Sequence, residues 1–295
     1  MSIDRREFLK VGAAFGVGSV FVSGCASLST KTATSARVTP EETTAQISRY
    51  LEGRGYTKVK PAPLVTGHSF NGGLEYDEDE TSLKPSTYVL QTVARANDVS
   101  VAHVPGALPL FTILGVKTGE GAKGDYAVDL LMGYLTKDAG LDPQRIRLTT
   151  TERASHCFPL FEKYGITKSQ IRLRPWAEAF ADGNGSGYFK PPGHPRKPAF
   201  ESISLEYLLT GGKEIEMGEI LYHSGMRPRG GALGIERVTM ARNDRAMMWS
   251  EGLGAFKAAV EADAKRQGRP LPPGYYQVLG LGRMTRRRGE RSMGG

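Results

Sequence analysis

Cysteine is nearly absent from this chain of 295 residues, which contains only Cys25 and Cys157. A scaffold held by several disulfides is therefore excluded, and a hydrophobic core has to hold the fold. Histidine is also scarce, and the five histidines share no metal-ligand spacing such as HxxxH. A structural zinc site is therefore not expected.

Long hydrophobic runs are missing as well. The uncharged stretch from Val11 to Gly24 has 14 residues, whereas a membrane-spanning helix needs roughly 20 apolar residues. The stretch follows a basic start that contains Arg5 and Arg6 and ends in small residues, which is typical of a secretory signal. The paired arginines resemble a twin-arginine signal, which is read by a receptor and is not an anchor. This resemblance implies that the twin-arginine export machinery carries the chain out in folded form.

The end of this leader, from Val22 to Cys25, resembles a lipobox. The resemblance implies that Cys25 is lipidated, attaches the chain to a membrane, and leaves Cys157 without a disulfide partner. We then expect the protein in the periplasm or at the outer face of the cytoplasmic membrane. An ordinary signal cleaved nearby and an uncleaved amphipathic start are the alternatives.

Composition divides the chain into four parts. Residues 1–25 form the signal, and the small polar residues 26–38 are typical of a flexible, disordered tether. Residues 39–250 form the main domain, and residues 251–295 form a final helix and a basic tail. The tail segment 283–291 is rich in arginine, which is typical of a solvated, disordered block. On an exported protein, a lipid surface or a wall polymer is its expected anionic partner.

Periodicity and turn signals predict an α+β domain with an antiparallel sheet flanked by helices. A capping box at Thr39 and Glu42 starts the first helix. The expected strands are 56–65, 88–94, 108–116, 145–151 and 215–222. The expected helices are 125–139, 158–164, 235–245 and 251–265. Residues 181–200, rich in Gly, Pro and Lys, are expected to form a long loop.

The segment Arg229–Ala241, RGGALGIERVTMA, is the most specific internal motif. Its glycines let the backbone approach a ligand, and Arg237 can reach an anionic group. It resembles the third motif of class II aminoacyl-tRNA synthetases, with matches at Gly230, Gly234, Glu236 and Arg237. RGYTKVKPAPLV, at residues 54–65, resembles the first motif with one residue too many.

The order of the segments between these motifs resembles the activation domain of alanyl-tRNA synthetase. The matching segments are QTVARAND with Arg95, LPLFTILG with Leu110 and Phe111, the stretch 123–152, and EIEMGEILYH with Glu216 and Glu219. Together they span residues 46–245. The resemblance implies a class II synthetase-like fold and, because such enzymes are often dimers, a homodimer.

In that family the domain joins a carboxylate to ATP, which gives an acyl-adenylate and pyrophosphate. The resemblance implies that Arg95 binds the α-phosphate, where negative charge builds up, and that Arg237 contacts the γ-phosphate end. Phe111 or Leu110 would cover the adenine, Gly234 would lie beside the nucleotide, and Mg²⁺ would bridge phosphates. Arg95 and Arg237 could instead simply pair with surface carboxylates.

Several departures from the family weaken alanine as the substrate. The aspartate that holds the amino group of alanine falls at Gly230, and the aromatic residue of the alanine pocket falls near Lys190. A lysine there favours an acidic group over a methyl group. Glu216 and Glu219 remain as further substrate-binding candidates. The tRNA-binding, editing and C-terminal regions of the family have no counterpart, so tRNA is not an expected partner.

Three functions fit these observations. The first is an exported paralog that activates a small-molecule carboxylate other than alanine with ATP. The second is a secreted lipoprotein that binds a small molecule or nucleotide and has lost the chemistry. The third is a truncated alanine-tRNA ligase, which requires the leader to be accidental.

Overall fold

The computed structural model describes residues 37–65, 85–119, 126–190, 199–222, 228–248, 252–271 and 275. The chain divides into Met1–Ala36 and a second compact unit, Arg37–Gly295. Arg5, Arg6 and Cys25, the tether up to residue 36, and the arginine-rich segment 283–291 all lie outside the described residues. The fold described below is that of the second unit.

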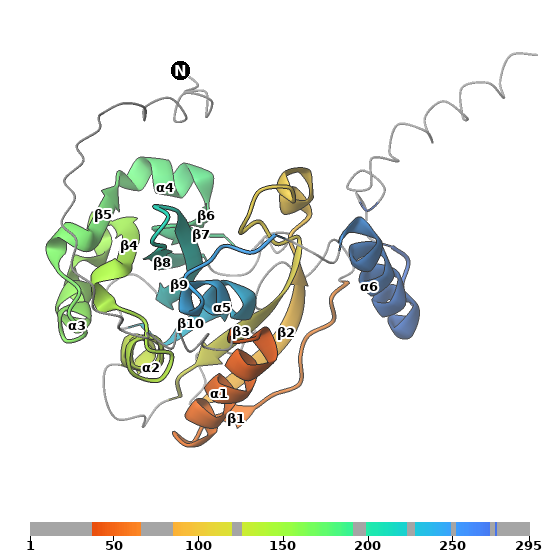
Figure 1. Cartoon of the computed structure of the whole chain (residues 1–295), viewed down its shortest axis with the longest axis horizontal. Coiled ribbons are helices and arrows are strands. Elements are labelled where there is room, and N and C mark those ends of the chain that lie inside the picture. The colour runs from red at the N-terminus through yellow and green to blue at the C-terminus, as the bar shows by residue number, and fades with distance from the viewer. Residues whose placement is uncertain are drawn as a thin grey trace, which may run out of the picture. The chain divides into compact units, whose positions relative to one another are not determined.

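The fold is α+β, with one large sheet flanked by helices, as the sequence predicts (Figure 1). The strand order is β1-β2-β3-β10-β9-β8-β4-β5, and the β6–β7 hairpin is attached to β8. Among the strands in the described residues, β1 with β2 and β4 with β5 are parallel pairs, and the other pairs are antiparallel. The strands are β1 Thr57–Lys58, β2 Thr87–Ala94, β3 Leu110–Lys117, β4 Ile146–Thr151, β5 Ile171–Arg174, β6 Asn184–Gly185, β7 Tyr188–Phe189, β8 Phe200–Leu208, β9 Glu214–Tyr222 and β10 Gly230–Gly234.

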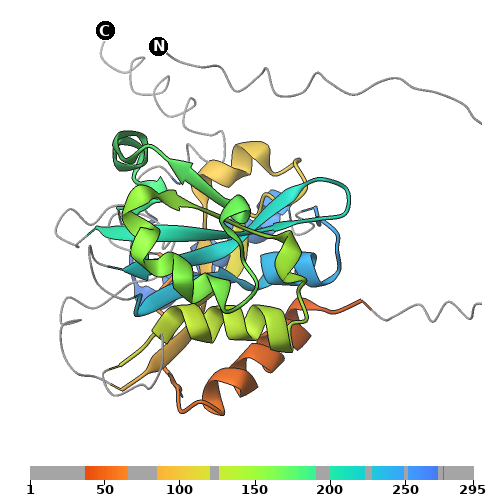
Figure 2. The same cartoon turned by 90° about the vertical axis from the view of Figure 1, so that its left-hand side faces the viewer.

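Helix α1, Pro40–Glu52, begins with the predicted capping box. The Thr39 hydroxyl accepts from the N–H of Glu42 at 3.2 Å, and the Glu42 carboxylate accepts from the N–H of Thr39 at 2.8 Å. The apolar stripe of α1, including Ile47 and Leu51, is buried as expected. Tyr50 donates to the carbonyl of Leu130 in α2 at 2.9 Å, and Figure 2 shows the two helices side by side.

The other α-helices are α2 Tyr126–Gly133, α3 Phe158–Glu162, α4 Trp176–Asp182, α5 Ile235–Arg242 and α6 Gly252–Gln267. The predicted helix 125–139 is α2 continued by one π-helical stretch, Tyr134–Asp138. A main core joins α1, α2, α3 and α5 to the sheet, and Cys157 is buried in it as a free thiol. In the described part of the chain, no helix is both long enough and apolar enough to span a membrane.

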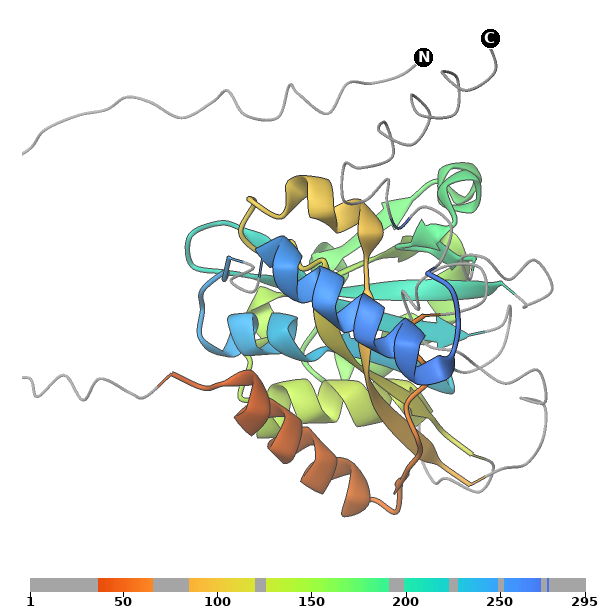
Figure 3. The ribbon, with the colours of Figure 1, turned by 90° about the vertical axis from the view of Figure 1, so that its right-hand side faces the viewer.

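A second apolar cluster fixes α6 against the sheet. It contains Leu64 and Val65, Ala94 at the end of β2, and Phe256 and Val260 of α6. Figure 3 shows α6 passing in front of β2 and β3. The buried Asp263 carboxylate accepts from the N–H of Val65 at 2.8 Å, which ties the helix to the extended segment before β2.

Two expectations need correction. The predicted strand 56–65 is reduced to Thr57–Lys58, because Pro61 and Pro63 have no N–H to donate to a ladder. The expected loop 181–200 contains the end of α4 and the β6–β7 hairpin, whose glycines supply the positive φ angles that the hairpin needs. Residues 191–198 of that expected loop lie outside the described residues.

Candidate functional site

Two arginines and a phenylalanine from three elements meet at one place in the fold. Arg95 directly follows β2, Phe111 is the second residue of β3, and Arg237 lies in the first turn of α5. The guanidinium carbon of Arg95 is 5.7 Å from the centroid of the Phe111 ring, and that of Arg237 is 5.2 Å from it. The fold thus brings together three residues that the sequence singled out separately.

Leu110, the neighbour of Phe111, belongs to another environment. Successive side chains of a strand point to opposite faces of the sheet, and Leu110 packs against the cluster that contains α6. Of Phe111 and Leu110, the two residues expected to cover the adenine, only Phe111 therefore lies beside the arginines.

Gly234, the last residue of β10, allows α5 to approach β3 closely. A Cβ atom at this position would lie 3.3 Å from Cδ of Arg237 and 3.4 Å from Cε2 of Phe111. The first distance is tighter than ordinary van der Waals contact and the second lies at its lower limit, so a larger residue would press against the Arg237 side chain. Gly234 thus has a packing role in the site.

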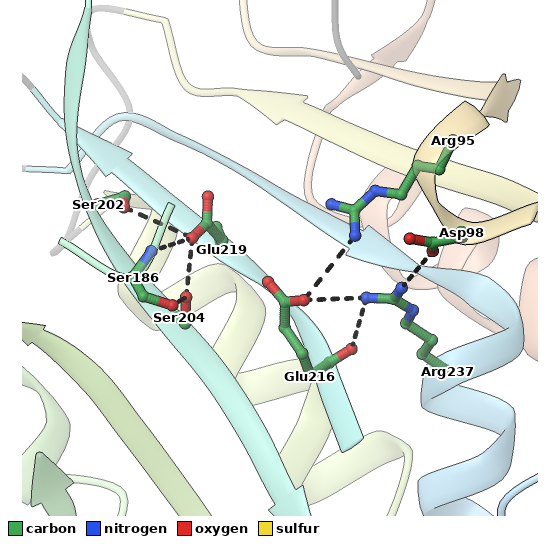
Figure 4. A network of polar contacts seen from close by, with 8 residues as sticks. All are labelled: Arg95, Asp98, Ser186, Ser202, Ser204, Glu216, Glu219 and Arg237. Carbon is green, nitrogen blue, oxygen red and sulfur yellow. Dashed lines mark hydrogen bonds and ion pairs between the residues drawn. The ribbon is translucent and has the colours of Figure 1, made fainter. Parts of the chain in front are cut away.

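Glu216 of β9 lies between the two guanidinium groups, as Figure 4 shows. Nη1 of Arg237 donates to Oε2 of Glu216 at 3.1 Å and to the Glu216 carbonyl at 3.3 Å. The same Oε2 is 4.0 Å from Nη1 of Arg95, and Oδ2 of Asp98 is 3.8 Å from Nη2 of Arg237. Two cations and two carboxylates therefore form one network.

Arg237 is the buried member of this network, with 8% of its surface exposed. Burial, and next the neighbouring Arg95, lower the pKa of Arg237 below its ordinary value, while Glu216 and Asp98 act in the opposite direction. Its Nε atom is buried and has no hydrogen-bond partner among the described residues. A buried donor without an acceptor is costly, so this position suits an anionic ligand.

A β-bulge places Glu216 and Glu219 on the same face of the sheet. Residues three apart in a regular strand point to opposite faces. Here Leu205 pairs with Gly218 and Glu206 pairs with Glu216, so Met217 is an extra residue on β9. Gly218 is required beside it, because a Cβ atom there would lie 1.9 Å from the carbonyl oxygen of Ala232.

Glu219 is held by three donors from the protein (Figure 4). Its Oε1 accepts from the N–H of Ser186 at 2.7 Å, from Oγ of Ser204 at 2.8 Å and from Oγ of Ser202 at 3.5 Å. Its Oε2 makes no hydrogen bond or ion pair with the described residues. Burial, and next the Glu216 charge, raise the pKa of Glu219 to about 7.

The β6–β7 hairpin packs directly on the Glu219 carboxylate. Gly185 has φ of 104°, and a Cβ atom there would lie 2.2 Å from Oε1 of Glu219. Ser186 has φ of 53°, which is uncommon for a residue with a side chain, and in this conformation its N–H points at the carboxylate. The hairpin therefore fixes the orientation of Glu219.

The serines that hold Glu219 were not predicted from the sequence. Ser202 and Ser204 alternate with apolar residues in β8, which would have been a usable signal for a polar face of a buried strand. Ser186 lies within the stretch that was expected to be a loop. Its role depends on a contact between residues 33 positions apart, which no local pattern reveals.

Lys190 and Gly230, two predicted substrate-binding residues, contact residues outside the network of the two arginines. Nζ of Lys190 donates to the carbonyl of Phe180 at 3.2 Å and lies over the rings of Phe180 and Tyr188. Gly230 begins β10 and pairs with Lys117 and Leu221, at the opposite end of the strand from Gly234. Among the described residues, the structure shows no hydrogen bond or ion pair between Lys190 and either Glu216 or Glu219.

No group of three or more His, Cys, Asp and Glu residues in the described part of the chain could hold a metal ion. Mg²⁺ commonly binds through one or two carboxylates together with substrate phosphates. At this site the ion would therefore be bound mainly by nucleotide phosphates, with Glu216, and Glu219 on the same face of the sheet, as candidate carboxylate ligands. The two arginines and the unpartnered Nε of Arg237 fit the phosphates themselves.

No family model matches the chain, and no curated protein matches it. Three similar solved structures are aminoacyl-tRNA synthetases. They are the aspartyl enzyme of Entamoeba histolytica (11% identity, TM-score 0.40, 71% of this chain and 55% of that chain), the apo histidyl enzyme of S. aureus (12%, 0.38, 77% and 77%), and the asparaginyl enzyme of Entamoeba histolytica in complex with asparaginyl-adenylate (14%, 0.32, 69% and 62%).

The chain thus spans about half the length of the aspartyl enzyme. A likeness at these identities does not identify an activity, a substrate or a partner of this chain.

Proposed function

We propose that this chain is an exported class II aminoacyl-tRNA synthetase-like protein that activates a small carboxylic acid other than alanine with ATP. The observation that carries this proposal is the convergence of Arg95 and Arg237 on Phe111. Two guanidinium groups beside an aromatic face suit a ligand that combines phosphates with a flat base. The absence of an aspartate at Gly230 argues against alanine.

The proposed reaction transfers the adenylyl group to the acid. A carboxylate oxygen of the acid forms a bond to the α-phosphorus, and the bond between this phosphorus and the bridging oxygen of pyrophosphate breaks. Arg95, the more exposed arginine, would stabilise the charge that develops on the α-phosphate. Arg237, fixed by burial and by Glu216, would hold the more distal phosphates, and Phe111 would support the adenine. Mg²⁺ would neutralise phosphate charge when it is bound with the nucleotide.

Exchange of labelled pyrophosphate into ATP, measured with a panel of carboxylic acids, tests this proposal. We expect one class of acid to support exchange, and we expect Arg95→Ala to lower the rate at least about 100-fold, as is typical for the loss of a charge-stabilising donor. Arg172→Ala is the matched control, because Arg172 is an exposed, carboxylate-paired arginine of β5 on the same sheet. Equal losses in the two variants would contradict the assignment of Arg95.

A second candidate is a secreted binding protein that has kept the site without the chemistry. The ion pair between Glu216 and Arg237 favours it, because the charge of the buried arginine is already balanced inside the protein. This candidate predicts binding of an adenine nucleotide or another anion in calorimetry, together with no pyrophosphate exchange for any acid.

The remaining parts of the proposal concern location and assembly. A twin-arginine leader with Arg5 and Arg6 and a lipidated Cys25 would place the domain at the outer face of the cytoplasmic membrane or in the periplasm. A homodimer is proposed from the family resemblance, and sedimentation of the leaderless protein tests it. tRNA is not a proposed partner, so charging of tRNA with alanine in vitro would favour the truncated-ligase alternative.

A further inference from the structure

The proposed function places an anionic ligand against Arg95 and Arg237. In the structure, the carboxylate of Glu216 already lies against both arginines. Its Oε2 accepts from Nη1 of Arg237 at 3.1 Å and lies 4.0 Å from Nη1 of Arg95. The side chain is 37% exposed, whereas that of Arg237 is 10% exposed, so the carboxylate is the partner that has room to move. Glu216 reaches this position because the bulge in β9 turns it toward the same face as Glu219.

We propose that Glu216 is an internal competitor for the anion site, a residue that sets how strongly the arginines bind a ligand. The proposal rests on the proposed function in assigning an anionic ligand to Arg95 and Arg237. An incoming phosphate group has to displace the carboxylate from Arg237 before it can contact both guanidinium groups. The apparent affinity of the site is therefore reduced by the fraction of molecules in which the internal ion pair is closed.

Other charges near the pair support a movable Glu216. Asp98 is 3.8 Å from Nη2 of Arg237 and can keep a carboxylate beside the buried guanidinium after Glu216 leaves. Glu219 is fixed by three donors and lies on the same face, so its charge repels Glu216 and weakens the hold of Glu216 on the arginines. The buried cation is thus not left unpaired when a ligand takes the place of Glu216.

Calorimetric titration with pyrophosphate in the presence of a metal chelator tests this inference without any contribution from a metal ion. We expect Glu216→Gln to bind pyrophosphate about 3- to 10-fold more tightly than the wild type, which corresponds to an ion pair closed in roughly 70–90% of the molecules. Glu214→Gln is the matched control. It removes an arginine-paired carboxylate two residues away on the same strand, but its partner is Arg172. It should leave the affinity unchanged.

Weaker or unchanged binding by Glu216→Gln would overturn the inference and would make Glu216 a contributor to ligand binding or a bystander. Failure of both proteins to bind pyrophosphate at millimolar concentration would overturn it as well. If Glu216→Gln does not fold, Glu216→Asp serves as the second variant. We expect it to bind pyrophosphate more tightly than the wild type, because its carboxylate is one methylene group farther from Arg237 and competes less well with the ligand.

The two proposals can fail separately. Tighter pyrophosphate binding by Glu216→Gln together with no ATP–pyrophosphate exchange would support the competitor role and contradict the activation of an acid. ATP–pyrophosphate exchange by the wild type together with weaker pyrophosphate binding by Glu216→Gln would support the activation of an acid and contradict the competitor role.

Discussion

At the scale of single residues, Glu219 links the stability of the protein to pH. Burial raises the pKa of its carboxyl from the ordinary 4.5 to about 7. Between these two values the folded chain holds a proton that the unfolded chain has released, so the free energy of unfolding falls as the pH rises through this window. Above about pH 7 the folded protein bears the full cost of a buried charge.

We therefore predict that Glu219→Gln removes this part of the pH dependence. The amide oxygen of glutamine can still accept from Ser186 and Ser204, and glutamine does not ionise. The free energy of unfolding of the variant minus that of the wild type should be larger at pH 8 than at pH 5, by an amount on the order of 1–3 kcal/mol. Urea unfolding of both proteins at the two pH values measures the difference.

The control for this experiment is Glu214→Gln, which changes an exposed carboxylate of the same strand. All other titrating groups are shared by the proteins, so their contributions cancel in the comparison. An identical change in stability with pH for wild type and Glu219→Gln would show that Glu219 ionises in the folded protein as it does in the unfolded chain.

At the scale of elements, the bulge in β9 is the feature that assembles the site. If β9 were a regular strand without the bulge, Glu216 and Glu219 would point to opposite faces, and only one of them could lie near the arginines. Gly218 permits this geometry because β10 approaches so closely that no Cβ atom fits between Gly218 and the Ala232 carbonyl. The bulge and the small residue beside it therefore act together.

We predict that Gly218→Ala lowers the free energy of unfolding by about 2–4 kcal/mol, because either the strands separate or the bulge moves. It should also abolish binding of anions at the site. Gly211→Ala is the control, since nothing lies within 4 Å of a Cβ atom at that position, and its effect should stay within about 0.5 kcal/mol. Similar losses of stability in both variants would show that the close contact with Ala232 is not what requires the glycine.

The elements that the sequence predicted correctly are those with a strong local pattern. The apolar runs 88–94 and 108–116 are β2 and β3, and they pair with each other in antiparallel fashion as expected. The capping box at Thr39 starts α1. In contrast, β8 was missed, because its FESISLEYL pattern places serines and a glutamate inside a buried strand. The hydroxyl groups of these serines have a partner distant in the sequence, Glu219.

In the candidate site too, the residues with a local sequence motif could be predicted, and the features that depend on distant contacts could not. Arg95, Phe111 and Arg237 could be singled out from their motifs, and the fold brings them together. The orientation of Glu216 and Glu219 could not be predicted, because it depends on one extra residue in the pairing of β8 with β9. The family resemblance predicted Lys190 near the substrate, and this stays a prediction; in the structure its ammonium group donates to the carbonyl of Phe180.

At the scale of the whole molecule, the leader and the proposed nucleotide site predict different cellular locations. A nucleotide-using site needs ATP, which is scarce outside the cytoplasm, whereas the leader predicts export. The twin-arginine route carries folded proteins, so the domain Arg37–Gly295 would be complete, with its site formed, before it crosses the membrane. The two halves of the proposal are therefore compatible if a nucleotide or adenylate that the folded domain binds in the cytoplasm is carried out with the protein.

We predict that the paired substitution Arg5→Lys with Arg6→Lys leaves the protein in the cytoplasm, because the receptor reads the arginine pair and not the charge alone. Fractionation and immunoblotting measure this, and a cytosolic control protein reports leakage.

Cys25→Ser should separate the two steps of the proposal, export and lipid attachment. The protein is still exported, but without a lipid on Cys25 it is recovered in the soluble periplasmic or secreted fraction. Membrane attachment that survives Cys25→Ser would show that another part of the chain holds it there, and the basic segment 283–291 would then be the first candidate.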